Sequence, residues 1–531
     1  MKQTKWRLIS FVCVFAVIAL TSCGEGDRDG GTRDAEGSFA FHGYPIQTDT
    51  TLTYWMGLNS LVAPFTKDFG ETEFAKALEK QTGVKVIYRH PAQGQEKEQF
   101  NLMLASKDLP DLIKWDWLSD FPGGPDQAIK SGYITPLNDY FTQNSPNLKA
   151  YLDAHPDVDR NVKTDTGNYF FYPSINAAKE IKTYMGPVVR KDWLEELHLP
   201  IPETIDDWYT MLTAFRDQKG ASAPLSYTWM ASCFIGAYGI DEKFYLDDGE
   251  IKYGPVEPGY KEFLTTYHKW FAEKLLDQNI GTVDSKLLDM NVLTGKTGAS
   301  VSAIGSTLGR WAASMAEQGK EFNMIAVPYP ALNRGEKVQF AQVGQNVAPT
   351  ASTAISQNCG NKELAAAYLD YGYSEAGHML YCFGTEGVSY TMENGAPRYT
   401  DLIMKNPDGI PPVQTLANYT HAIYGGCYAV DFRPYEQYYG TQAQKDALRI
   451  FADTDAEQHL LPPITLTTDE SDEVSGLITD INTYVDEMFL KFVMGIEPLS
   501  NYDAYVANIK RLKLDRVIEV YQAALKRYYE R

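Results

Sequence analysis

The segment Trp115-Asp116-Trp117 places a carboxylate between two large aromatic side chains, at the end of the expected strand 111–115. Aromatic rings present flat apolar faces, and an ionised carboxylate accepts hydrogen bonds from hydroxyl groups. Together, these side chains could bind a ligand that has both apolar faces and hydroxyl groups. Whether they meet such a ligand depends on the elements that position them.

Strands and helices alternate around this segment. Strands are expected at 51–58, 84–89 and 111–115, and amphipathic helices at 71–83 and 97–106. This β-α-β-α-β order predicts a parallel, doubly wound sheet. Because ligands bind such sheets beyond the carboxyl ends of the strands, the side chains that follow each strand are candidate binding residues.

Further helices are expected along the chain. Thr204, followed by Asp207, forms a capping pattern at the start of a helix that runs to about 215. Segments 260–276 and 362–374 have helical spacing, and the last sixty residues predict two more helices. The acidic segment 241–250 is interpreted as a turn between two strands, because Lys243 and aromatic residues interrupt its acids.

The N-terminus has the pattern of a secretory signal. Lys2, Lys5 and Arg7 precede the apolar run 8–20, which is shorter than the roughly 20 residues that span a bilayer. Leu20-Thr21-Ser22-Cys23 resembles the bacterial lipobox, so we expect a signal peptide at 1–22 and a lipid on Cys23. A Gly-rich, acidic linker would then occupy 23–49.

Charge and cysteine content exclude several classes of partner. The formal charge is −21, and removal of the three basic residues of the signal peptide gives −21 − 3 = −24. Such an acidic chain is repelled by nucleic acid and by anionic membranes, so only the lipid anchor is expected to contact a membrane. The remaining cysteines of the mature chain form no C-x-x-C motif, so metal and redox chemistry have no support from the sequence. Whether any of them form disulfides is left open; they are Cys233, Cys359, Cys382 and Cys427.

Several segments, in order, resemble one family. The most specific are FGTEGVSY (383–390) and the Lys-Asp-Trp-Leu segment within 188–215. Other matching segments lie at 106–113, 287–300, 358–390, 482–495 and 519–528. They resemble the lipoprotein extracellular solute-binding proteins of carbohydrate ABC importers, in particular those related to alginate-oligosaccharide-binding proteins.

The resemblance implies an α/β, two-lobed, periplasmic-binding-protein-like fold of type II. Each lobe would hold a doubly wound, mainly parallel sheet flanked by helices, and the chain would cross between lobes more than once. The N-lobe would comprise 50–175 and 335–392, and the C-lobe 180–330 and 393–531. The implied function is to capture a carbohydrate, expected to be an oligosaccharide, in the cleft and to deliver it to ABC permease transmembrane subunits. The resemblance further implies a monomer that has no cofactor and no enzymatic activity.

A sugar presents apolar C–H faces and hydroxyl groups, so aromatic, carboxylate, amide and guanidinium side chains are the candidates to bind it. Those at strand ends, in expected loops or in the Glu-Gly motif are Trp55, Asn59, Trp115, Asp116, Trp117, Trp229, Arg310, Trp311, Glu386 and Tyr390, with Tyr424 as an addition. Trp193, Trp208 and Trp270 lie in helical stripes and are expected in the core.

The chain departs from the family pattern in one place, and two alternative functions remain open. Many relatives bind calcium after the helix that begins near 204, but the corresponding segment 216–227 has a single acid, so no metal is expected there. A lipid-anchored glycan hydrolase is an alternative, because acids are abundant and such an enzyme needs two carboxylates about 5 to 9.5 Å apart. A sugar receptor that feeds a sensor kinase is a third possibility.

Overall fold

The computed structural model describes residues 41–63, 65–230, 232–321, 323–421 and 425–531. The predicted signal peptide, the lipidation site Cys23, most of the linker and Tyr424 lie outside the described residues. Within the described residues, no helix is both long and apolar enough to cross a membrane.

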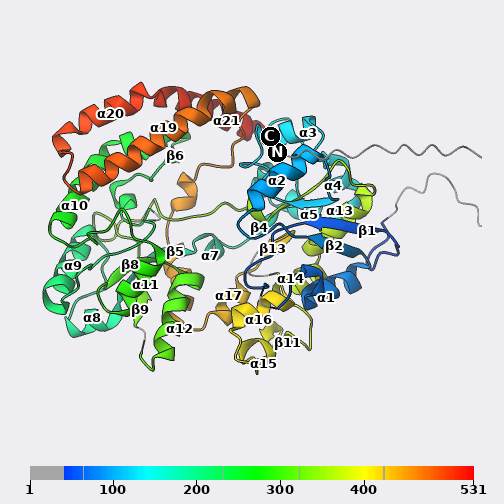
Figure 1. Ribbon diagram of the computed structural model, residues 1–531, viewed down its shortest axis with the longest axis horizontal. Helices are drawn as coiled ribbons and strands as arrows, with labels where there is room; N and C mark the ends of the chain where they lie inside the picture. Colours follow the sequence, from blue (N-terminus) through cyan, green and yellow to red (C-terminus); the bar gives the residue numbers. More distant parts are fainter. Residues whose placement is uncertain (1–40, 64, 231, 322, 422–424) are drawn as a thin grey trace, which may run out of the picture. The chain divides into compact units, whose positions relative to one another are not determined.

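The first sheet has four strands in the order β10-β3-β1-β2, of which Figure 1 labels β1 and β2. Its strands are β1 (Thr51–Trp55), β2 (Lys85–Arg89), β3 (Leu112–Lys114) and β10 (Thr353–Ile355). β1 pairs in parallel with β2 and with β3, whereas β10 is antiparallel to β3. The predicted parallel β-α-β-α-β opening is confirmed, with α1 (Glu73–Thr82) and α2 (Glu96–Ser106) as its helices.

Local sequence explains where these helices begin and end. Thr72 caps α1 by accepting a hydrogen bond from the backbone N–H of Ala75, and Gly83 ends it with a left-handed φ of 75°. The capping box predicted for α9 (Ile205–Lys219) is present, because Thr204 and Asp207 each bond the other's backbone N–H.

The second sheet has three strands, β8 (Ala299–Ala303), β5 (Met185–Arg190) and β9 (Met324–Ala326), in that order. The central strand β5 is antiparallel to both neighbours, so the prediction of a mainly parallel sheet in each lobe is wrong for this sheet. The chain passes from the first sheet to the second at β5 and returns to the first sheet at β10. Neither strand follows a β-α-β crossover from a neighbouring strand of its own sheet, so the local sequence does not set its direction.

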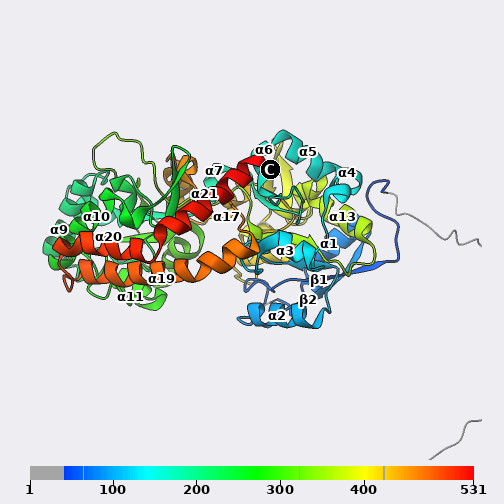
Figure 2. The same cartoon turned by 90° about the horizontal axis from the view of Figure 1, so that it is seen from above.

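One buried cluster surrounds the second sheet and draws its members from 188–341 and 439–520. Trp193, Trp208 and Trp270 belong to it and are nearly or fully buried, which confirms their prediction as core residues. Three helices, α19 (Thr468–Val493), α20 (Tyr502–Arg511) and α21 (Leu514–Glu530), pack on one another (Figure 2), so the C-terminal part has one helix more than predicted.

Three two-stranded pairs complete the strands. β6 (Phe244–Asp247) and β7 (Glu250–Tyr253) form a hairpin, which confirms the predicted turn in 241–250. β11 (Tyr390–Glu393) pairs with β12 (Ala396–Tyr399), and β4 (Ser174–Asn176) pairs in parallel with β13 (Tyr428–Val430).

The contacts of residues 396–430 bear on the expected division into lobes. β13 pairs with β4, and α16 (Pro412–Tyr419) packs on α1. The sequence placed 393–531 in one lobe. That boundary remains a prediction, and these contacts favour a later one.

The other helices lie in two sets of chain segments. Those within 41–182 and 353–438 are α3 (Gly124–Lys130), α4 (Asn138–Asn144), α5 (Pro146–Ala154), α6 (Pro156–Asn161), α7 (Lys179–Lys182), α13 (Lys362–Asp370), α14 (Glu375–Phe383), α15 (Asp401–Met404) and α17 (Arg433–Tyr438). Those within 183–352 and 439–531 are α8 (Lys191–Glu196), α10 (Pro258–Ala272), α11 (Ser285–Leu293), α12 (Gly309–Glu317) and α18 (Gln442–Ala452).

Candidate functional site

The predicted tryptophans of the first sheet pack on one another at the ends of β1 and β3. The Trp115 ring stacks on Phe100 of α2 with 4.4 Å between centroids, and its edge meets Trp55 at 5.6 Å. Trp117 is fully buried against Phe100 and Phe121. Trp117 thus presents no ring face to solvent in this structure, because α2 and the following loop cover the ring, and a ligand role for it stays a prediction.

The polar candidates beside them stabilise turns. Asp116 Oδ1 accepts hydrogen bonds from the backbone N–H groups of Leu118 at 3.1 Å and Ser119 at 2.9 Å. Asn59 Oδ1 accepts one from Leu61 N–H at 2.8 Å. These bonds hold the loops that follow β3 and β1, so the structure gives both side chains a structural role. Their part in ligand binding stays a prediction.

Arg310 and Trp311 share one acceptor, Asp289 of α11. Arg310 donates to both carboxylate oxygens, at 2.8 and 3.1 Å, and Trp311 Nε1 donates at 2.7 Å. These bonds lower the pKa of Asp289 although partial burial opposes them. Trp311 is fully buried and presents no ring face to solvent, and a ligand role for it stays a prediction.

The Glu-Gly motif forms a tight turn after α14. Gly387 N–H donates to the Tyr390 carbonyl at 2.8 Å, and Glu386 is exposed. Tyr390 is buried and packs on Phe383. Neither residue lines the cavity described next, and a ligand role for them remains a prediction.

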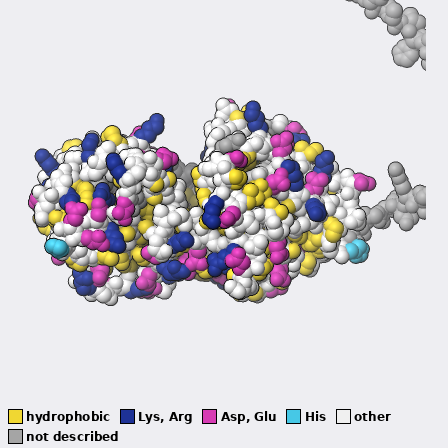
Figure 3. Space-filling model, turned by 90° about the horizontal axis from the view of Figure 1, so that it is seen from below, with side chains coloured by type: hydrophobic (Ala, Val, Ile, Leu, Met, Phe, Trp, Pro, Cys, Tyr) yellow, Lys and Arg dark blue, Asp and Glu magenta, His cyan; other side chains and the backbone are white. Residues whose placement is uncertain are grey.

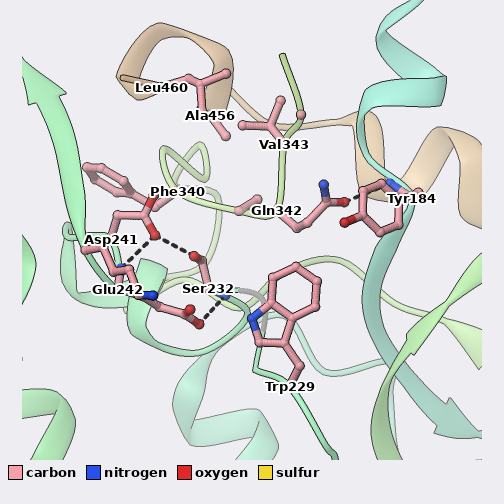
Figure 4. A pocket seen from close by; sticks show the side chains of 13 residues that line it. Tyr184, Trp229, Ser232, Asp241, Glu242, Phe340, Gln342, Val343, Ala456 and Leu460 are labelled. Atoms are coloured by element: carbon pink, nitrogen blue, oxygen red, sulfur yellow. Dashed lines mark hydrogen bonds between the residues drawn. The ribbon is translucent and has the colours of Figure 1, made fainter. Parts of the chain in front are cut away.

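One cavity of about 270 Å³ combines exposed aromatic rings with carboxylates (Figure 4). Trp229 and Tyr184 line it and are 47% and 46% exposed, which is unusual for such large side chains. Trp229 is thus the one predicted residue that the structure places in this cavity. The lining residues are Tyr184, Trp229, Ser232, Asp241, Glu242, Lys243, Phe340, Ala341, Gln342, Val343, Gly344, Ala456 and Leu460.

An acidic pair forms one wall of this cavity just before β6. Ser232 holds both acids, because its hydroxyl donates to Asp241 Oδ1 at 2.5 Å and its backbone N–H donates to Glu242 Oε1 at 2.7 Å. Burial raises the pKa of Asp241, and it raises the pKa of Glu242 to about 7, with the Asp241 charge adding to the rise. Hydrogen bonds from Ser232 and Trp229 oppose the rise at Glu242.

Gln342 links two chain segments that border the cavity, its own and residues 182–185. Its Oε1 accepts from the backbone N–H groups of Tyr184 at 2.8 Å and Met185 at 3.1 Å, and its Nε2 donates to the Lys182 carbonyl at 3.1 Å. Gly344 N–H donates to the same carbonyl at 2.9 Å. The position of the Tyr184 ring therefore depends on Gln342.

Sequence reasoning missed most of this cavity. Tyr184, Ser232 and Gln342 lie in segments without a motif, and Asp241 and Glu242 were assigned only to a turn. Their shared signal is weak: two adjacent acids just before a strand, in the same part of the chain as the candidate Trp229. The cavity exists because four chain segments distant in sequence meet there.

The described residues contain no group of three or more His, Cys, Asp or Glu side chains that could hold a metal ion. Cys233, Cys359, Cys382 and Cys427 are buried and free. For Cys427, burial raises the pKa of the thiol to about 12. The Cys427 thiol therefore has the protonated, unreactive character of a core cysteine.

Comparison with known proteins identifies the class. A family model described as "Bacterial extracellular solute-binding protein" matches residues 60–379. The chain belongs to this family. Its members' structures are two-lobed, in agreement with the two sheets described above.

Particular relatives extend the match. The chain is 24% identical over 523 residues to the fructooligosaccharide ABC transporter substrate-binding protein FusA of Streptococcus pneumoniae, covering 92% of this chain and 91% of FusA. It is 23% identical over 364 residues to lipoprotein LipO of Bacillus subtilis, covering 66% and 69%. The crystal structure of alginate-binding protein AlgQ2 without calcium ion superposes with a TM-score of 0.70 at 24% identity, covering 91% of this chain and all of that one.

Proposed function

We propose that this protein captures an oligosaccharide in the cavity between Trp229, Tyr184 and the Asp241–Glu242 pair, and delivers it unchanged to the permease of an ABC transporter. The observation that carries the proposal is the pairing of two exposed aromatic rings with carboxylates in one cavity. Rings can stack on the apolar faces of a sugar, and carboxylates accept hydrogen bonds from its hydroxyl groups. The near full-length similarity to FusA, which is named for fructooligosaccharide, supports this ligand class.

The position of the cavity supports a coupling between capture and domain closure. Tyr184 and Gln342 lie on segments that connect the regions of the two sheets. A ligand that binds such segments better in one arrangement of the lobes stabilises that arrangement. We also propose that Cys23 carries the lipid anchor at the extracellular face of the membrane, and that the lobe boundary predicted at 392/393 lies nearer to 438.

A glycan hydrolase is the rival function, and Glu242 is the observation that favours it. A carboxyl with a pKa of about 7 suits a general acid. Asp241 and Glu242, however, are adjacent in sequence and both are held by Ser232. A hydrolase needs its two carboxyls on either side of the scissile bond. This arrangement instead favours binding.

A thermal-shift screen with neutral and acidic oligosaccharides tests the proposal. Binding raises the melting temperature in proportion to RT ln(1 + [L]/Kd), so one sugar class should give a saturable rise. Chromatography of the same mixture after a day should return that sugar intact. No shift with any sugar would refute the binding function, and consumption of the sugar would favour the hydrolase. For the anchor, Cys23→Ala should release the protein from membranes into the medium.

A further inference from the structure

The charges that line the cavity are few and mainly negative. They are Asp241, Glu242 and Lys243, a formal sum of −1, and no arginine or histidine is among the described residues that line the cavity. On the face that Figure 3 shows, acidic and basic side chains are interspersed. Charges inside the cavity are less screened than those on the surface, so they weigh most in the selection of ligand charge.

The two acids retain capacity to accept hydrogen bonds from a ligand. Asp241 Oδ1 accepts from the Ser232 hydroxyl and from Glu242 N–H, while Asp241 Oδ2 accepts no hydrogen bond from the described part of the chain. An ionised carboxylate only accepts hydrogen bonds, so this oxygen fits a ligand hydroxyl and repels a ligand carboxylate. Ser232 N–H also donates a hydrogen bond to Glu242, so Ser232 holds both acids side by side on the same wall of the cavity.

Lys243 does not reverse this preference. It is exposed, and a lysine ammonium is a strongly hydrated point charge rather than the planar fork with which arginine binds carboxylates. His459 lies near Asp241, but its Nδ1 bonds the Leu246 carbonyl at 2.9 Å. Lys243 is therefore the one described cation in the cavity lining, and the two acids beside it outnumber it.

We infer that the cavity selects uncharged oligosaccharides and rejects uronic acid oligosaccharides, with Asp241 and Glu242 as the residues that decide. This inference rests on the proposed function and narrows its ligand class. At a separation near 5 Å and an effective dielectric constant of about 20, one like-charge contact costs enough to weaken binding by more than tenfold.

The test is isothermal titration calorimetry at pH 8 with matched pairs of trisaccharides. The neutral member of each pair is a sugar that raises the melting temperature, and the other member is its uronic acid counterpart, such as trigalacturonic acid for galactotriose. The neutral member should bind at least about tenfold more tightly than its uronic acid counterpart. A uronide with equal or tighter binding would overturn the inference and leave the binding function intact. If neither kind of sugar binds, the proposed function fails, and the inference fails with it.

Charge-neutral variants then show which residues decide. Asp241→Asn and Glu242→Gln each keep the oxygen that accepts from Ser232, so both should fold, and the double variant should narrow the preference to less than about threefold. Asp248→Asn is the matched control. Asp248 is exposed in the β6–β7 turn at φ 50°, which asparagine tolerates, and it does not line the cavity. An unchanged preference in the double variant, or a loss in the control, would contradict the role of the acidic pair.

Discussion

Replacement of Trp229 by alanine should weaken sugar binding while leaving the protein folded. The side chain is 47% exposed, so about half of the roughly 250 Å² that a tryptophan can bury is open to ligand. A sugar lying on one ring face would cover about half of that, near 60 Å². At about 25 cal/mol per Å², the lost contact is about 1.5 kcal/mol, or roughly a tenfold rise in Kd.

Two assays separate binding from stability in this variant. Titration calorimetry should show the rise in Kd, and thermal unfolding of the ligand-free protein should show one cooperative transition, lowered by only a few degrees because about half of the side chain is buried. Ile496→Ala is a suitable control, because Ile496 is 67% exposed and lies outside the cavity. It should change neither quantity. Unchanged sugar affinity in Trp229→Ala would refute the assignment of the cavity as the ligand site.

Three further outcomes follow from the same structure. Gln342→Ala leaves the partly buried backbone N–H groups of Tyr184 and Met185 without their acceptor and should lower the free energy of unfolding by about 1 to 3 kcal/mol in urea titrations. A change below about 0.5 kcal/mol in the same titration would contradict this. The pKa of Glu242 rises on folding from 4.5 to about 7, so the folded state binds more protons in that range and stability should fall as pH rises through it, by up to about 3 kcal/mol. Glu242→Gln should remove this slope, and a slope that persists would assign it to other groups. Asp165→Asn leaves the buried Arg531 without its carboxylate and should destabilise the protein by about 3 kcal/mol in denaturant titrations, whereas the exposed Asp503→Asn should not; equal effects would show that the pair contributes nothing specific.

Elements defined by neighbouring residues were predictable from the sequence. The capping box of Thr204 and Asp207 lies within four residues, and Gly83 ends α1 because a left-handed φ favours glycine. The alternation of β1, α1, β2, α2 and β3 follows from periodicities of two and 3.6 residues. These signals depend on local sequence alone.

Features that depend on distant segments were not predictable in the same way. β5 is antiparallel to β8 and β9 because of where the chain enters the sheet, which no local pattern records. Trp117 and Trp229 both lie outside regular strands, yet one is fully buried and the other half exposed. The difference arises from Phe100 and Phe121, which cover Trp117.

A crystal structure with the neutral oligosaccharide that gives the largest thermal shift tests the central claim most directly. The account predicts sugar density against the Trp229 ring, with a hydroxyl within about 3 Å of Asp241 or Glu242. Density located instead at Trp55 and Trp115, with the Trp229 cavity filled only by water, would contradict it.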